Sequence, residues 1–281
     1  MSGRTDAPVG DWLAYRIVDA FTDGPWSGNP AAVVLPSDPA PSRETRQAIA
    51  AELNLSETAF PSLPDAEGVR ELRWFTPTTE VSLCGHATLA TAHALLEEGA
   101  GSPLHFSSHS GPLTVHLEED GRLRMDFPAD PPNFGPSPPG LMEALGVLDE
   151  SPWGAGARCG IVLLEDESAV RALTPDLAAL RRVPLPMGML GVSVTAPGDE
   201  VDFVSRFFGP WVGVDEDPVT GMAHCVLGPY WAVETARTTL EARQGLTRAG
   251  ALTVRVEGDR VHLIGHATTV ARGELRSAPP S

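Results

Sequence analysis

The alternation of apolar and polar residues divides the chain into short predicted strands separated by turn-rich segments. Residues 15–20 and 31–36 are typical of strands, and the segment 21–30 between them is dense in turn-forming residues. Ser42 is a suitable N-terminal cap for a helix that runs to about Leu53, where Asn54 ends it. The same pattern predicts further strands at residues 58–61, 69–75, 104–106, 113–117 and 123–127.

Two predicted helices have almost no polar face. They cover residues 85–97 and 221–233, and each begins at a glycine. A helix that is apolar on all sides is expected to be buried on all sides, so each of these two needs a surrounding layer of strands. Glu-rich and Gly-containing turns at 118–121 and 257–259 indicate tight hairpins beside those helices, the first joining strands 113–117 and 123–127.

The second half of the chain repeats the first in outline. Residues 73–77 resemble 206–210, residues 84–87 resemble 220–223, and residues 113–118 resemble 252–257, at offsets of 133, 136 and 139. The alternative is that these short apolar segments resemble one another by chance. The repeat predicts two copies of one unit, each a curved antiparallel sheet around a central helix.

The domain boundary is predicted at a proline-rich segment. Residues 128–139 contain six prolines, which lack backbone donors and disfavour a regular element. We interpret this segment as the linker between an N-terminal domain at 1–128 and a C-terminal domain at 129–281.

Composition and charge narrow the class of protein. The chain has 281 residues, of which 42% are hydrophobic, and its net charge of −17 disfavours nucleic acid or an anionic membrane as a partner. No window has 18 unbroken apolar residues, and residues 1–11 lack the layout of a signal peptide, so a cytoplasmic location is expected. Three cysteines without C-x-x-C spacing and scattered histidines predict reduced thiols and no metal site.

The two apolar helices also suggest chemistry. The first N–H groups of a helix have no partner within the helix, and glycine lets an anion approach them closely. If the two repeats pack about a pseudo-two-fold axis, the ends at Gly85 and Gly221 would face a shared cleft and hold a carboxylate. The simpler alternative is that both glycines are ordinary turn residues.

Several short sequence motifs together resemble those of one protein family. They are D-A-F-T at 19–22, G-N-P-A at 28–31, L-S-E-T at 55–58, C-G-H-A-T at 84–88 and E-D-P-V-T-G at 216–221. In this order, over nearly the whole chain, they resemble the phenazine biosynthesis PhzF-like family. The resemblance implies the diaminopimelate-epimerase fold. This is an α+β fold of two pseudo-symmetric domains, each a barrel-like, mostly antiparallel sheet around a central helix, with the active site in the cleft between them. The resemblance also implies a homodimer and a cofactor-independent isomerase acting on a small carboxylate-bearing metabolite.

The resemblance also implies site residues. The acid/base glutamate falls on Glu57, with His86 and Asp217 as the other catalytic residues. The implied substrate-binding residues are Asn29, Gly85, Ala87, Thr220, Gly221 and Met222. A carboxyl group in a dry cleft is expected to have a raised pKa, which suits a residue that takes a proton from one carbon and returns it to another. The alternatives are that His86 and Asp217 only cap their helices.

Two further functions stay open beside this one. A two-base racemase of the same fold would use Cys84 as one base, although Thr220 stands at the matching position of the second repeat and Cys225 lies further into that helix. A ligand-binding protein could also have kept the fold without the reaction. Met222 stands where the family commonly has serine or another small residue, so the sequence does not identify the substrate.

Overall fold

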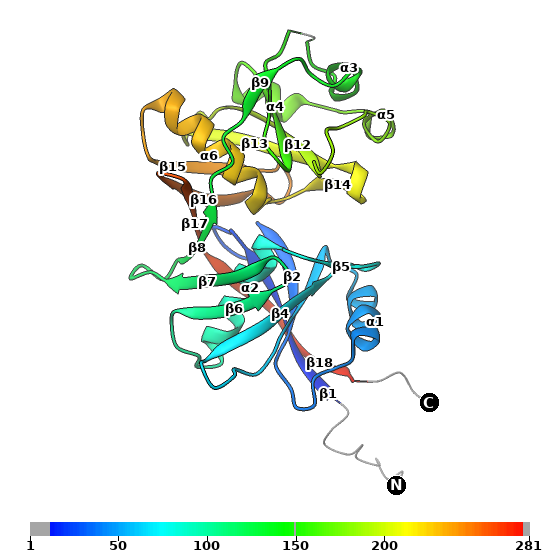
Figure 1. Cartoon of the computed structure of the whole chain (residues 1–281), viewed down its shortest axis with the longest axis vertical. Helices are drawn as coiled ribbons and strands as arrows, with labels where there is room; N and C mark the ends of the chain where they lie inside the picture. The colour runs from blue at the N-terminus through cyan, green and yellow to red at the C-terminus, as the bar shows by residue number, and fades with distance from the viewer. Residues whose placement is uncertain (1–11, 149, 278–281) are drawn as a thin grey trace. The chain divides into compact units, whose positions relative to one another are not determined.

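The computed structural model describes residues 12–148 and 150–277, which form two compact units (Figure 1). Of these residues, unit 1 contains 12–20, 30–116 and 267–277, and unit 2 contains 21–29, 117–148 and 150–266. The sequence of residues 1–11 was interpreted as lacking the layout of a signal peptide. These residues lie outside the described part of the chain. None of the described helices has the length and apolar character that a membrane-spanning helix needs.

Unit 1 is a mixed sheet with two helices. Its strands are β1 (Trp12–Ala20), β2 (Asn29–Val34), β3 (Glu57–Pro61), β4 (Val69–Phe75), β5 (Glu80–Val81), β6 (Leu104–Ser108), β7 (Gly111–Leu117) and β18 (Ala267–Arg276). Its helices are α1 (Arg43–Leu53) and α2 (Gly85–Glu97). β2 pairs in parallel with β3, and β4 with β6, whereas β3–β4, β4–β5, β6–β7 and β1–β18 are antiparallel.

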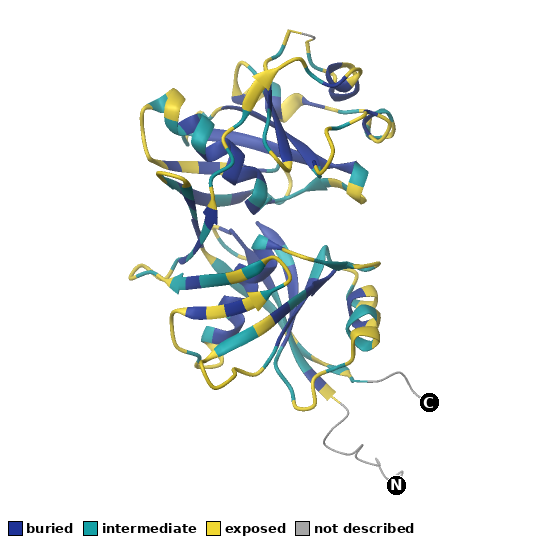
Figure 2. Cartoon of the chain, viewed as in Figure 1, coloured by how far each residue is buried: buried dark blue, intermediate teal, exposed yellow. Residues whose placement is uncertain are grey.

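Helix α2 is the buried centre of unit 1, as the sequence predicts. It contacts β1, β3 and β18, and it is dark blue over most of its length in Figure 2. Its small side chains, such as Ala87, Ala90 and Ala94, are fully buried and allow strands to pass close on several sides. Helix α1 also has its predicted ends, because the Ser42 side chain accepts a hydrogen bond from the Thr45 N–H and Asn54 adopts the left-handed conformation.

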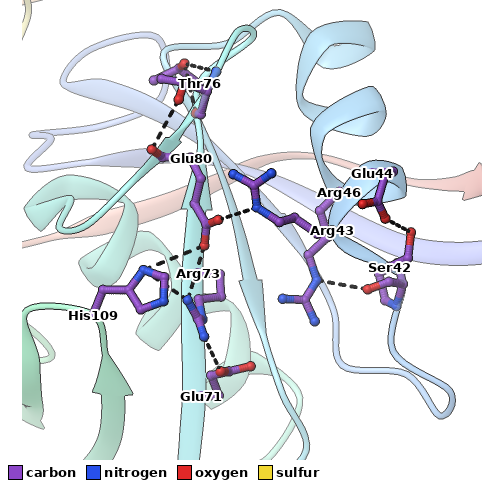
Figure 3. A network of polar contacts seen from close by, with 11 residues as sticks. Ser42, Arg43, Glu44, Arg46, Glu71, Arg73, Thr76, Glu80 and His109 are labelled. Carbon is purple, nitrogen blue, oxygen red and sulfur yellow. Dashed lines mark hydrogen bonds and ion pairs between the residues drawn. The ribbon is translucent and has the colours of Figure 1, made fainter.

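A network of ion pairs fixes α1 against β4 and β5 (Figure 3). Glu80 accepts hydrogen bonds from Arg43 Nε at 2.9 Å and from Arg73 Nη1 at 3.3 Å, and Arg73 also contacts Glu71 and His109. The two arginines hold the pKa of the half-buried Glu80 carboxyl below its usual value, although burial opposes this. Because β5 leads directly into the start of α2, the network also fixes the chain that reaches Cys84.

Unit 2 has a larger mixed sheet. Its strands are β8 (Leu123–Pro128), β9 (Asn133–Gly135), β10 (Trp153–Ala155), β11 (Cys159–Leu163), β12 (Gly191–Pro197), β13 (Phe203–Gly209), β14 (Val214–Asp217), β15 (Thr239–Gln244), β16 (Gly250–Glu257) and β17 (Arg260–Gly265). Its helices are α3 (Leu141–Leu145), α4 (Glu167–Ala172), α5 (Leu177–Leu180), the 3₁₀ helix η1 (Pro210–Val212) and α6 (Gly221–Thr235). Helix α6 contacts β11, β15, β16 and β17 and is the central helix of this unit.

The predicted repeat is present in the strand pairing. In unit 2, β11 pairs in parallel with β12, β12 antiparallel with β13, β13 parallel with β15, and β15 antiparallel with β16. This is the order of parallel and antiparallel pairs found for β2, β3, β4, β6 and β7 in unit 1. Two copies of one α+β unit, each with a central helix, therefore account for most of the described chain.

The structure differs from the predicted hairpin and segment assignments. The turn at 118–121 forms, but the hairpin between 113–117 and 123–127 is wrong, because β8 pairs with β17 from Arg260↔Pro128 to Gly265↔Leu123. The six-proline segment contains β9, which pairs with β10 inside unit 2. β18 belongs to unit 1 because it pairs with β1, so the compact units do not follow the predicted 1–128 and 129–281 division.

Candidate active site

Glu57 is the first residue of β3, and its backbone is fixed on both sides. β3 lies between β2, where Ala31 pairs with Glu57, and β4, where Phe75 pairs with Thr58. The side chain is 16% exposed, so the carboxyl group is largely removed from water. A carboxylate in this environment needs a partner, because burying an unpaired charge is costly.

The partner of Glu57 is His86, the second residue of α2. His86 Nε2 lies 3.2 Å from Glu57 Oε2, and the imidazole is almost fully buried. The contact is an ion pair between the carboxylate and the charged imidazole. Ser56 Oγ lies 3.4 Å from the same ring nitrogen.

Cys84 completes this group of side chains at the N-terminal end of α2. Its Sγ lies 3.6 Å from His86 Nδ1 and 3.9 Å from His86 Nε2. Cys84 occupies the N-cap position without capping the helix through its side chain, and its carbonyl accepts a hydrogen bond from Thr88 Oγ1 at 2.6 Å. One ligand atom from each of Glu57, Cys84 and His86 lies within 4.8 Å of the other two, so the three could hold a metal ion.

The electrostatics of the group differ from the sequence-based expectation for Glu57. Burial acts to raise the pKa of its carboxyl, but His86, Ser56 and Cys84 together hold this pKa below its usual value. Burial acts to lower the pKa of His86, yet Cys84 and Glu57 raise it well above the ordinary histidine value. The expected raised pKa of Glu57 is therefore wrong, because the charged imidazole outweighs the loss of water.

The thiol of Cys84 is protonated at neutral pH. Burial, reinforced by the negative charge of Glu57, raises its pKa to about 11. Because the thiolate is the basic and nucleophilic form of cysteine, Cys84 is poorly suited to remove a proton in this state. The resting group is thus a carboxylate, an imidazolium and a thiol.

Asp217 belongs to a polar cluster within unit 2. Its Oδ1 accepts a hydrogen bond from Asn29 Nδ2 at 2.7 Å, and its Oδ2 accepts one from Thr220 Oγ1 at 2.5 Å. Asn29 also donates to the Val219 carbonyl at 3.0 Å. The carboxylate therefore joins Asn29, the first residue of β2, to Thr220 at the start of α6.

Gln244 of β15 is the residue of this cluster that the sequence does not single out. It is fully buried, accepts a hydrogen bond from the Thr220 N–H at 3.0 Å, and donates to the Asp217 carbonyl at 2.8 Å and to Thr220 Oγ1 at 3.0 Å. No local sequence pattern could have found it, because its partners Asp217 and Thr220 precede α6 in the sequence and Gln244 follows it. Ser56, by contrast, was adjacent to Glu57 in the L-S-E-T word.

The other predicted substrate-binding residues lie at the two helix starts. Gly85 and Gly221 are the first residues of α2 and α6, as predicted. Ala87 is fully buried, whereas Thr220 and Met222 are partly exposed. Their roles in binding a substrate stay predictions.

The two repeats differ at the position of Glu57. Phe75 of β4 pairs with Thr58, and its counterpart Phe208 of β13 pairs with Val192. The residues that precede Thr58 and Val192 are Glu57 and Gly191, so glycine occupies the glutamate position in unit 2. A Cβ atom at Gly191 would lie 2.4 Å from Phe207 Cζ and 2.5 Å from the Phe208 carbonyl oxygen, which leaves no space for a side chain.

Comparisons with known proteins agree over almost the whole chain. A family model described as phenazine biosynthesis-like protein, PhzC-PhzF, matches residues 18–273. A protein of Pseudomonas aeruginosa described as an uncharacterized isomerase is 51% identical over 266 residues, which cover 94% of this chain and 98% of that protein. A solved PhzF-family structure from Enterococcus faecalis is 43% identical, with a TM-score of 0.87 over 94% of this chain and 99% of its own.

A more distant structure shares the fold alone. A hydroxyproline epimerase from Agrobacterium vitis is 12% identical, with a TM-score of 0.59 over 95% of this chain and 93% of its own. Together with the family match and the related isomerases, the fold and site define a small-molecule isomerase. The chain belongs to the phenazine biosynthesis-like PhzC-PhzF family, which confirms the resemblance found in the sequence.

Proposed function

We propose that the protein is a one-base isomerase of a small carboxylate-bearing metabolite, with Glu57 as the general acid/base. The observation that carries the proposal is the asymmetry of the repeat. Unit 1 has Glu57, Cys84 and His86, whereas Gly191, Thr220 and Met222 stand at the corresponding positions of unit 2. None of these three replacements is a base at neutral pH, so a second set of proton-transfer groups is absent from those positions.

The protonation states support Glu57 as the group that accepts the proton. With its pKa held low by His86, the carboxyl is an anion at neutral pH and can accept a proton. Glu57 would take a proton from a substrate carbon while the electron pair of that C–H bond moves into the conjugated system and a double bond shifts. The protonated carboxyl then returns a proton to another carbon and is again an anion. Exchange of this proton with solvent while it is on Glu57 brings deuterium to the product carbon.

His86 would act on this reaction through charge. Its imidazolium stabilises the Glu57 carboxylate before the proton moves, and it keeps the carboxyl group oriented during the transfer. Asp217 would be a positioning residue, because the chain's own Asn29 and Thr220 donate to its two carboxylate oxygens. Its effect on activity would then pass through the start of α6.

Proton exchange tests the proposal directly. The protein is incubated in deuterated water with a panel of unsaturated and hydroxylated carboxylates, and incorporation at carbon is followed by NMR. We expect label at a carbon of at least one substrate together with a shifted double bond. Glu57→Gln should abolish the label. The control Glu52→Gln, which makes the same change at an exposed residue of α1, should leave the label unchanged.

The two alternatives give different results in the same assay. A racemase that uses Cys84 would incorporate label at one stereocentre without moving a double bond, and Cys84→Ala would abolish this label while Glu57→Gln retained it. Absence of exchange across the whole panel would favour a ligand-binding protein. Either result would overturn the one-base proposal.

A further inference from the structure

Arg206 of β13 is a buried arginine whose side chain joins β14 to the segment around α4. The side chain is 6% exposed and donates from Nε and Nη2 to the two carboxylate oxygens of Glu216, each at 2.8 Å. Its Nη1 donates to the Val170 carbonyl at 3.2 Å and to the Leu173 carbonyl at 2.6 Å. Every nitrogen of the guanidinium group therefore has a partner, and a rotation of this side chain would break several charge-assisted hydrogen bonds.

The pair of Arg206 and Glu216 determines the face of the sheet to which Asp217 points. Asp217 pairs directly with Phe207 of β13. Paired residues point to the same face of a sheet, and successive residues of a strand point to opposite faces. Asp217 and Phe207 therefore share one face, whereas their neighbours Glu216 and Arg206 share the other. While Arg206 holds Glu216, the Asp217 side chain is kept on the opposite face.

The backbone pairing of β14 fixes this orientation only weakly. β14 pairs with β13 at two positions, Phe207↔Asp217 and Gly209↔Val214, with a register shift between them. An irregularity of this kind leaves residues of the longer strand unpaired, and Glu216 is one of the two residues that lie between the pairs. The side-chain bonds from Arg206 thus hold β14 at the point where its backbone pairing is interrupted.

The other repeat has the same kind of pair at the corresponding place. Arg73 of β4 corresponds to Arg206, and Glu80, like Glu216, stands four positions before the N-cap residue of the central helix. Arg73 Nη1 lies 3.3 Å from Glu80 Oε1. In both units an arginine of the sheet thus holds the segment that enters the central helix. The residue after the glutamate differs, since it is Val81 in unit 1 and an aspartate in unit 2.

We infer that Arg206 and Glu216 are positioning residues of the proposed isomerase and act through Asp217. The buried pair fixes the direction of the Asp217 carboxylate, which accepts hydrogen bonds from Asn29 and Thr220. These two residues are predicted to bind the substrate, so a weaker pair should loosen substrate binding without removing a reacting group. The effect on the reaction rests on the proposed function, whereas the coupling between the pair and Asp217 does not.

Deuterium exchange measured over a range of substrate concentrations tests the effect on the reaction. The substrate is the carboxylate of the panel that exchanges fastest with the unmodified chain. Arg206→Lys keeps the charge but loses the two-point contact, and it should raise KM about tenfold or more; Glu216→Gln should do the same. The pH dependence of kcat should be unchanged, because the Glu57–His86 pair belongs to unit 1 and Arg206 contacts residues of unit 2. A role in stability alone would lower the amount of folded enzyme, and so kcat, but would not change KM.

Asp215 provides a matched control on the same strand. It forms an ion pair with Arg181 at 2.7 Å, and both side chains are 54% exposed. Asp215→Asn makes a comparable change at a neighbouring acid and should leave KM unchanged. The double variant Arg206→Lys/Glu216→Gln should have the KM of the more affected single variant, because the two residues act through one contact. A KM raised by the product of the two single effects would contradict this.

The side-chain amide of Asn29 reports the coupling without any substrate. In two-dimensional amide NMR spectra of the assigned protein, its two N–H signals should shift in Arg206→Lys and in Glu216→Gln, because the Asp217 carboxylate that accepts from it moves. Asp215→Asn should leave both signals in place. If Arg206→Lys does not fold, Glu216→Gln decides the point, since that side chain is 32% exposed and its amide oxygen still accepts a hydrogen bond. Unchanged Asn29 signals in folded Glu216→Gln would overturn the inference.

The two measurements separate this inference from the proposed function. Exchange by the unmodified chain, with KM unchanged in both single variants, would refute the positioning role and leave the isomerase proposal standing. Shifted Asn29 signals in a chain that exchanges no member of the panel would refute the isomerase proposal and leave the coupling to Asp217 standing.

Discussion

Gln244→Met tests whether the polar cluster at the start of α6 stabilises unit 2. Methionine has nearly the length and volume of glutamine but neither donates nor accepts strong hydrogen bonds. The change removes the three hydrogen bonds that Gln244 makes to Thr220 and Asp217. At about 1 kcal/mol for each bond, the free energy of unfolding should fall by about 3 kcal/mol.

A matched control is available in unit 1. Gln47 of α1 is half-buried and donates one hydrogen bond, to the Thr76 carbonyl at 2.9 Å. Gln47→Met should therefore cost about 1 kcal/mol or less. Both free energies of unfolding are measured by urea denaturation, with the slope of each transition checked against the unmodified chain.

Hydrogen exchange locates the effect. In Gln244→Met, peptides that cover the first turns of α6 should exchange faster, whereas peptides from α2 should be unchanged. The reasoning is refuted if Gln244→Met is no less stable than Gln47→Met, or if protection falls equally in α2 and α6. Either result would mean that the three hydrogen bonds do not hold the start of α6.

Three further predictions concern unit 1 and its counterpart. Gly191→Ala should lose about 1–3 kcal/mol of stability by urea denaturation, because its Cβ would overlap Phe207 and the Phe208 carbonyl, whereas exposed Gly101→Ala should change little. The raised pKa of His86 stabilises the fold fully below pH 6.5, and this contribution is lost as the pH rises through the folded value. His86→Gln should therefore remove part of the alkaline decline in melting temperature; an unchanged decline would contradict the ion pair. With a pKa of about 11, Cys84 should be alkylated by iodoacetamide far more slowly at pH 8 than a free thiol, and an equal rate would show that it is not buried.

The helices and the repeat were predictable because their signals are local. An uninterrupted run of apolar residues after Gly85 or Gly221 can satisfy its backbone only as a buried helix, and α2 has the predicted bounds. The helix at Ser42 was likewise fixed by its cap. Strand partners are set by distant residues instead, which is why β8 pairs with β17 and not with its neighbour in sequence.

The site was only partly predictable for the same reason. The family motifs identified Glu57 and His86 separately, but only the fold shows that Glu57 Oε2 lies 3.2 Å from His86 Nε2. The Glu57 pKa is lowered because His86 is this close. The sequence-based argument considered burial alone and therefore predicted a raised pKa. Gln244 had no signal, since its role depends on the meeting of β15 with the start of α6.

The glycine at position 191 has a stereochemical consequence for the proposed reaction. A carboxylate on one side of a planar conjugated intermediate can deliver its proton only to the side from which it took it. Because glycine, which is not a base, stands at the counterpart of Glu57 in the repeat, the proposed reaction has Glu57 as its single base. Removal and return of the proton would then both occur at Glu57, so the transfer should be suprafacial. A two-base enzyme would instead protonate the opposite side and invert a stereocentre.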